Sequence, residues 1–386
     1  MSKPDFAALV ALAILSIALA GLAFSFGGMD LGVYYAAARV TLQGGNPYDY
    51  QQLAPQIVSS AGRLNNPYYY APWFTWMVAP LALFSYNIAR ALWAAINFVL
   101  WFWSLFNLSA LVEYPRLGWR KWGMWLLVTF VFAWSTWGAE QVGILILFLF
   151  TLILLFIRRE NWTAVGMCLA VVLFKPNITA LPAGMIALWL LLRRKTWKPI
   201  LFMFGTVAAL MVISLIITPG WYVPLFDADK IQGLSYTLDE TGGLEVARYT
   251  TTLTDWLAAY GVGESQSNGI YGFVILLGAV IVLLGLRYSA SALEFLALAI
   301  LVNFMAIPYA LFYDYPPLTI TLFYGNFLLL KSPSLRRARY AANAFIVAAL
   351  FVGDIIPYRY WITIILLLLV GVGYFASWRN NRPLKV

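Results

Sequence analysis

Histidine is absent from this 386-residue sequence, and cysteine occurs once, as Cys168. The lack of histidine removes the side chain most often used for proton transfer near neutral pH, and the commonest metal ligand. A single cysteine cannot form an intramolecular disulfide, and its place in an apolar run is typical of a small buried thiol. Any acid–base chemistry must therefore come from Asp, Glu, Lys, Arg or Tyr.

Charge is also scarce, at 11% of the residues against 62% hydrophobic ones, whereas soluble domains carry about 25% charged residues. A soluble core could not absorb this much apolar surface, so the sequence predicts an all-α polytopic membrane protein. We expect residues 1–386 to form one transmembrane domain. Phosphate-binding loops, dinucleotide fingerprints and nucleophile elbows are missing. No acidic cluster has a spacing suited to metal, so neither a cofactor nor a metal site is predicted.

The net charge of +9 does not indicate a nucleic-acid partner. The basic residues form short clusters between apolar runs, where the positive-inside rule places them. If the N-terminus is cytoplasmic, most of the 25 basic residues fall on the cytoplasmic side and most of the 16 acidic residues on the outer side. We therefore expect a multi-pass protein of the plasma membrane with both termini in the cytoplasm.

Twelve apolar runs approach the length of about 20 residues that a membrane-crossing helix needs. They are 6–26, 87–111, 119–137, 139–157, 161–174, 177–193, 198–218, 269–287, 291–307, 312–330, 340–356 and 361–378. The run 71–84 is short and begins with proline and aromatic residues, so it is read as a re-entrant or interfacial helix. The fold class is therefore a bundle of about twelve transmembrane helices.

Two long segments are predicted on the outer side. The first, 27–70, contains an amphipathic stretch at 31–43 that we read as a juxtamembrane helix, and the second, 219–268, is polar and acidic. Loops this long in a compact protein are usually functional or disordered. The N-terminal run also fits a signal peptide cleaved after Ala18-Leu19-Ala20, although the many spans that follow favour a retained first helix.

Ionisable residues gather at four points that the topology places on the outer face. They are Asp30, Glu140-Gln141, Lys175-Pro176-Asn177 and Tyr313-Asp314. An ionisable group at membrane depth is by default a functional hypothesis. Four such groups on one side predict a single polar cavity.

Each of these residues also has a structural interpretation. Asp30 can cap the helix that follows it, and Glu140-Gln141 can simply begin a helix at the interface. Lys175 can reach the headgroups through its long side chain, and Asp314 can form a structural ion pair. Arg248, in the second long loop, can be a solvated side chain.

The first part of the chain resembles the opening of glycosyltransferase family 87. The likeness rests on Asp30 with Val33-Tyr34-Tyr35-Ala36, then Gly44-Gly45-Asn46-Pro47-Tyr48, then Tyr70-Ala71-Pro72. Further along, Trp137-Gly138-Ala139-Glu140-Gln141-Val142-Gly143 resembles the family's "GQ" segment. Lys175-Pro176 with Leu181-Pro182 resembles its lysine–proline segment, and Pro308 through Tyr313-Asp314 its late motif. The likeness spans roughly residues 30–330.

The resemblance implies a polytopic enzyme of the GT-C type that moves a sugar, typically mannose, from a polyprenyl-phosphate donor to a lipid or glycan acceptor. Asp30 would take the proton from the acceptor hydroxyl, which displaces the polyprenyl phosphate with inversion. Lys175 and Arg248 would hold the phosphate, because preorganised cations stabilise developing negative charge. The remaining expected substrate-binding residues are Glu140, Gln141, Tyr313, Asp314, Tyr34 and Tyr35.

The chain departs from the family pattern at two places. Some members carry histidine near the late motif, where this chain has Tyr313-Asp314, and Glu140 stands before Gln141 in place of the "GQ" glycine. Two other functions are kept as alternatives. A transporter or flippase would place its ionisable groups near the bilayer midplane in repeated halves, and a transferase-like scaffold can serve envelope assembly without catalysis.

Overall fold

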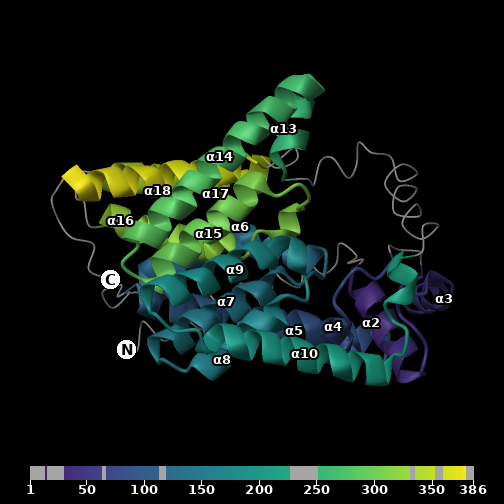
Figure 1. Ribbon diagram of the computed structural model, residues 1–386. Coiled ribbons are helices and arrows are strands. Elements are labelled where there is room, and N and C mark those ends of the chain that lie inside the picture. The colour runs from purple at the N-terminus through teal and green to yellow at the C-terminus, as the bar shows by residue number, and fades with distance from the viewer. Residues whose placement is uncertain are drawn as a thin grey trace.

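The computed structural model describes residues 14, 30–62, 67–112, 119–226, 251–330, 335–352 and 360–379. Within these residues the chain is helical and contains no β-strand, which confirms the predicted fold class (Figure 1). The predicted span 6–26, apart from Ile14, lies outside the described residues, and so does Arg248. Eleven of the twelve predicted spans correspond to helices.

The helices that correspond to predicted spans differ in length. They are α5 (Tyr86–Leu111), α6 (Trp119–Gly138), α7 (Gly143–Arg158), α8 (Trp162–Val172), α9 (Pro176–Arg193), α10 (Lys198–Ile217), α14 (Glu264–Tyr288), α15 (Ala292–Ala306), α16 (Leu318–Leu330), α17 (Arg336–Val352) and α18 (Trp361–Arg379). Four of them, α5, α9, α10 and α14, are long and apolar enough to cross a membrane. Others, such as α7, α8 and α15, are shorter apolar helices.

Helices α10 and α14 expose apolar surfaces that indicate which side of the bundle faces lipid. Only 6% of the most apolar window of α10 and 11% of that of α14 is buried within the protein. The exposed side chains of α10 include Phe204 and Ile216, and those of α14 include Phe273 and Leu283. A long helix that exposes such side chains is stable only in hydrocarbon, so the chain is a multi-pass membrane protein.

Helix α15 is the centre of the bundle. Every one of its residues except Ala306 is buried, and it packs against α9, α14 and α16. Ser291 caps its N-terminus by accepting a hydrogen bond from the backbone of Glu294. The helix ends before Ile307, so its rigid C-terminus fixes the start of the segment 307–317.

A side chain of α15 completes the hydrogen bonding of α9. Pro182 lies inside α9 and has no N–H to donate to the carbonyl of Ile178 four residues earlier. The Nδ2 of Asn303 donates to that carbonyl at 3.1 Å. In lipid an unsatisfied backbone carbonyl is costly. Asn303 therefore satisfies the free carbonyl of α9 and also fixes α9 against α15.

The segment before α5 forms short helices at one end of the bundle (Figure 1). They are α2 (Asp30–Leu42), α3 (Tyr50–Ala61), α4 (Pro72–Val78) and the 3₁₀ helix η1 (Ala79–Leu83). Residues 72–83 are too few to cross about 30 Å of hydrocarbon, and their interfacial or re-entrant placement stays a prediction. The prediction of an amphipathic helix at 31–43 was wrong in its pattern. Helix α2 is buried on all sides because α3, α4, α5 and η1 pack around it.

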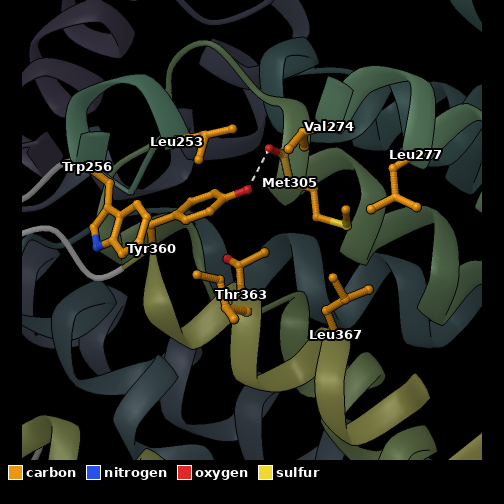
Figure 2. Close-up of a pocket in the computed structure, with 9 residues that line it drawn as sticks. Leu253, Trp256, Val274, Leu277, Met305, Tyr360, Thr363 and Leu367 are labelled. Carbon is orange, nitrogen blue, oxygen red and sulfur yellow. Dashed lines mark hydrogen bonds between the residues drawn. The ribbon is translucent and has the colours of Figure 1, made fainter. Parts of the chain in front are cut away.

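Near the far end of α15 lies a small apolar cavity of about 170 Å³ between α13 (Leu253–Ala259), α14, α15 and α18 (Figure 2). Tyr360 closes one side, and its hydroxyl donates to the backbone carbonyl of Met305 at 2.9 Å. This bond fixes the start of α18 to the C-terminal turn of α15. The cavity therefore lies beside the element that leads to the segment 307–317.

Candidate active site

Asp30 is the first residue of α2 and its side chain is half-buried. Its backbone N–H donates to the carbonyl of Ala139 at 3.4 Å, and its Oδ2 accepts a hydrogen bond from Gln141 Nε2 at 2.6 Å. A carboxylate in the first turn also interacts favourably with the helix dipole. A structural role at the start of α2 and a chemical role are therefore compatible.

Gln141 links Asp30 to the other polar residues of the site. Its Oε1 accepts from Tyr34 Oη at 2.9 Å, Tyr70 Oη at 3.1 Å and Lys175 Nζ at 3.3 Å. A carboxylate can only accept and an ammonium can only donate, so these partners fix the orientation of the amide. With 3% of its surface exposed, Gln141 is the buried junction of the site.

Lys175 and Asp314 form a buried ion pair, with Nζ and Oδ1 separated by 2.5 Å. Asp314 is fully buried, and its Oδ2 accepts from the backbone N–H of Leu311 at 3.2 Å. The ammonium also lies 5.1 Å from the ring centre of Tyr313 and 5.7 Å from that of Tyr70. The side chain of Lys175 is therefore directed into the protein and not toward headgroups.

The charge state of Lys175 follows from these neighbours. Burial lowers the pKa of an amine, but the charge and hydrogen bond of Asp314 together with the neighbouring Tyr70 and Asp30 more than offset this, so the pKa of Lys175 lies above its usual range. The amine is therefore protonated near neutral pH. Two of its three N–H groups have acceptors in Asp314 and Gln141.

Glu140 points away from Gln141. Its Oε1 accepts from Arg90 Nε of α5 at 2.6 Å, and the carboxylate is 2% exposed. The residue has a φ of 56°, a left-handed conformation that costs a non-glycine residue roughly 1–2 kcal/mol. In this turn between α6 and α7, the two adjacent side chains have different partners, Arg90 for Glu140 and Asp30 for Gln141.

The segment around Tyr313 is fixed by direct contact with the last turn of α6 and the first residue of α7. Thr136 Oγ1 donates to the carbonyl of Tyr313 at 2.8 Å, and Ser135 Oγ to that of Phe312 at 3.2 Å. A Cβ on Gly143 would lie 2.4 Å from the Tyr313 carbonyl oxygen and 2.8 Å from Pro316 Cδ. Only glycine allows the start of α7 to approach this segment so closely.

The predicted site residues thus divide into groups. Asp30, Tyr34, Gln141, Lys175 and Asp314 belong to one hydrogen-bonded network, with the half-buried Tyr313 against the lysine. Glu140 faces Arg90 on the other side of the turn. Tyr35 points elsewhere, because its hydroxyl donates to the Phe84 carbonyl at 2.8 Å. The place of Arg248 lies outside the described residues.

Sequence reasoning missed two residues of the site. Tyr70 was named only within the Tyr70-Ala71-Pro72 motif and not as a site residue, although its hydroxyl lies 2.7 Å from that of Tyr34 and contacts Gln141. Arg90 went unnoticed although a cation inside the predicted span 87–111 is itself a functional signal. No group of three or more Asp, Glu or Cys residues suited to a metal ion is found in the described residues.

The arrangement suits proton transfer next to a charged substrate. Asp30 is a half-buried carboxylate held by an amide donor, and the protonated Lys175 lies one hydrogen bond beyond that amide. A base must lie within hydrogen-bond reach of its proton and keep its orientation. In Asp30 and Lys175 the site offers an acceptor for a proton and a positive charge side by side.

Comparison with known proteins gives one match. The family model for glycosyltransferase family 87 matches residues 68–313, which is more than half of the chain and includes Gln141, Lys175 and Tyr313. No curated protein and no solved structure that was compared matches this chain. Asp30, Tyr34 and Asp314 of the network lie outside the matched residues. Because the match covers more than half of the chain, the chain belongs to glycosyltransferase family 87.

Proposed function

We propose that this glycosyltransferase moves a mannosyl group from a polyprenyl-phosphate donor to a hydroxyl of a lipid or glycan acceptor. The observation that carries the proposal is the pairing of Asp30 with Gln141 beside the buried ion pair of Lys175 and Asp314. Family membership supports sugar transfer over the transporter alternative. The helical membrane fold supports a donor carried by a lipid.

In the proposed reaction Asp30 is the general base. Its carboxylate accepts the proton of the acceptor hydroxyl as the hydroxyl oxygen attacks the anomeric carbon of the donor sugar. The bond from the anomeric carbon to the phosphate oxygen breaks on the opposite face, and the electron pair leaves with the polyprenyl phosphate. The new glycosidic bond therefore has inverted configuration, and the proton remains on Asp30 until solvent removes it.

Lys175 is proposed to stabilise the leaving phosphate. Its third N–H group is directed to neither Asp314 nor Gln141, so it can donate to an incoming phosphate oxygen. The pairing with Asp314 lowers the cost of holding the ammonium in a buried place before substrate arrives. A cation that is already oriented stabilises charge that grows in the transition state without reorganisation.

Exposed aromatic rings near the network suit a sugar substrate. Tyr69 and Tyr309 are 45% and 48% exposed, and the charges of Asp314, Lys175 and Asp30 act on Tyr309. Asn177 Nδ2 donates to the Tyr309 carbonyl at 3.4 Å, which connects this residue to the start of α9. Rings with an apolar face and a polar edge fit sugars, which have both kinds of surface.

We further propose that the site faces the outside of the plasma membrane, with both termini in the cytoplasm. The positive-inside distribution of the basic clusters supports this orientation. A donor arriving in the outer leaflet would then meet Asp30 and Lys175 without crossing the bilayer.

The donor class can be tested with the purified protein in liposomes. Polyprenyl-phosphate mannose, polyprenyl-phosphate glucose and a nucleotide-linked mannose, each radiolabelled, are offered with lipid extract as acceptor. We expect label in glycolipid or glycan only from the polyprenyl-phosphate donors, and most from mannose. Transfer from the nucleotide sugar alone would contradict the proposed donor class.

A further inference from the structure

Two helices of this protein end in the same backbone motif, each with glutamate in the left-handed position. At the end of α6, Glu140 N–H donates to Trp137 and Gln141 N–H to Thr136, and at the end of α7, Glu160 and Asn161 make the same pattern. Glycine usually takes the left-handed position of this motif. Glu160 is exposed, whereas Glu140 is 2% exposed, so the buried glutamate calls for a specific explanation.

Two residues of helix α5 form hydrogen bonds with Glu140 in the turn after α6. Arg90 Nε lies 2.6 Å from Glu140 Oε1, and Trp93 Nε1 donates to the Glu140 carbonyl at 3.0 Å. Residues three apart lie on one face of a helix, so α5 presents both groups to the same turn. One bond fixes the side chain of Glu140 and the other fixes its backbone.

The same turn touches Asp30 at two points. The residue before Glu140 accepts the Asp30 backbone N–H through the carbonyl of Ala139, and the residue after it, Gln141, donates to the Asp30 carboxylate at 2.6 Å. A shift or rotation of this turn would therefore move both the backbone and the side-chain partner of Asp30.

We propose that Arg90 and Glu140 are positioning residues for Asp30. Their ion pair holds the turn after α6 in the orientation that directs the Gln141 amide at the carboxylate, and Glu140 contacts neither sugar nor phosphate. This inference rests on the proposed role of Asp30 as the base. It explains why a glutamate occupies a position that glycine would fill at a lower backbone cost.

The test compares Glu140→Gln, Glu140→Gly, Arg90→Lys and the charge exchange Arg90→Glu with Glu140→Arg. Displacement of reacting groups by about 1 Å can lower a rate by about 100-fold, so we expect kcat to fall by about 10- to 100-fold in Glu140→Gln. We expect KM for donor and acceptor to change less than about 3-fold, since no substrate contact is lost. The exchanged pair should recover part of the kcat that each single charge reversal loses.

Glu160 provides the matched control. Glu160→Gln and Glu160→Gly change the same residue type in the same backbone motif, away from the network, and should leave kcat unchanged. Glu140→Gly is the sharpest variant, because glycine suits the left-handed backbone while the ion pair with Arg90 is lost. Yield and thermal unfolding in detergent show whether each variant folds.

Two kinetic results would overturn the inference. One is a wild-type kcat in both Glu140→Gln and Glu140→Gly, and the other is a large rise in one KM at unchanged kcat, which would assign Glu140 to substrate binding. A structure of Glu140→Gln gives a readout that needs no substrate. We expect the distance from Gln141 Nε2 to Asp30 Oδ2 to exceed about 3.5 Å, the limit of a hydrogen bond, and an unchanged distance would contradict the proposal even if no donor were turned over. Loss of transfer in wild-type protein with every lipid-linked sugar would instead refute the proposed function.

Discussion

Gln141 Nε2 donates to Asp30 Oδ2 at 2.6 Å, while the Oε1 of the same amide accepts from Lys175 at 3.3 Å. One neutral side chain thus bridges the carboxylate of Asp30 and the ammonium of Lys175. If the two charges met, the carboxylate would be less available as a base and the ammonium less available to a phosphate. The amide holds both groups close to each other and oriented.

Replacing Gln141 should therefore impair catalysis more than folding. We expect Gln141→Leu to lower kcat by roughly 10- to 100-fold, because Asp30 loses its donor and can turn toward Lys175. Steady-state kinetics with the lipid-linked donor measures the effect. A variant with unchanged kcat would show that the amide does not orient the base.

The buried ion pair predicts a non-additive effect on stability. Lys175→Met alone leaves Asp314 buried and uncompensated, which should lower the free energy of unfolding by about 3–5 kcal/mol. The double variant Lys175→Met with Asp314→Leu should be less destabilised than either single variant, since no buried charge remains. Thermal unfolding of the three variants in detergent measures this, and strictly additive losses would speak against the pairing.

The close approach at Gly143 gives a steric prediction. Gly143→Ala would place Cβ 2.4 Å from the carbonyl oxygen of Tyr313, a backbone atom that cannot rotate away. We expect a loss of stability and of transfer, because the segment that carries Asp314 must shift. Gly184→Ala in α9 is the control, since nothing lies within 4 Å of its added Cβ. Equal stability and equal transfer in the two variants would mean that residue 143 does not lie close to the Tyr313 carbonyl.

The hydrogen bond from Asn303 of α15 to the Ile178 carbonyl of α9 predicts that a second substitution can restore stability. Asn303→Leu removes the donor to the Ile178 carbonyl, which should cost about 1–3 kcal/mol for an unsatisfied buried acceptor. Pro182→Ala restores a backbone N–H four residues after Ile178, so the same Asn303 change should cost less in that background. Unfolding temperatures of the four proteins test this, and equal losses in both backgrounds would contradict it.

Hydrophobicity alone predicted the helices well, because each span needs a long apolar run whatever its neighbours are. Ionisable residues at membrane depth need a partner or a function, and this rule identified Asp30, Lys175 and Asp314 as candidate site residues. The burial of α2 on all sides could not be predicted, because it depends on how the helices that follow it in the chain fold back around it. Its polar residues suggested an amphipathic helix only while those neighbours were unknown.

The different partners of the Glu140 and Gln141 side chains could not be predicted from the sequence either. Both residues seemed equally suited to bind substrate, and only the left-handed backbone at Glu140 separates them. The partners of Glu140 are Arg90 and Trp93 of α5, which lie 50 and 47 residues away in the chain. Motif spacing records which residues are near one another in sequence, but not which way each side chain points.

The central claim is that Asp30 accepts the proton of the acceptor hydroxyl. It is tested most directly by Asp30→Asn, which keeps the size and polarity of the side chain but removes its basicity. With polyprenyl-phosphate mannose as donor, we expect kcat to fall by about 10²- to 10⁴-fold, while binding of the donor stays within a few-fold of wild type. A variant that folds, binds the donor and turns over at the wild-type rate would contradict the claim.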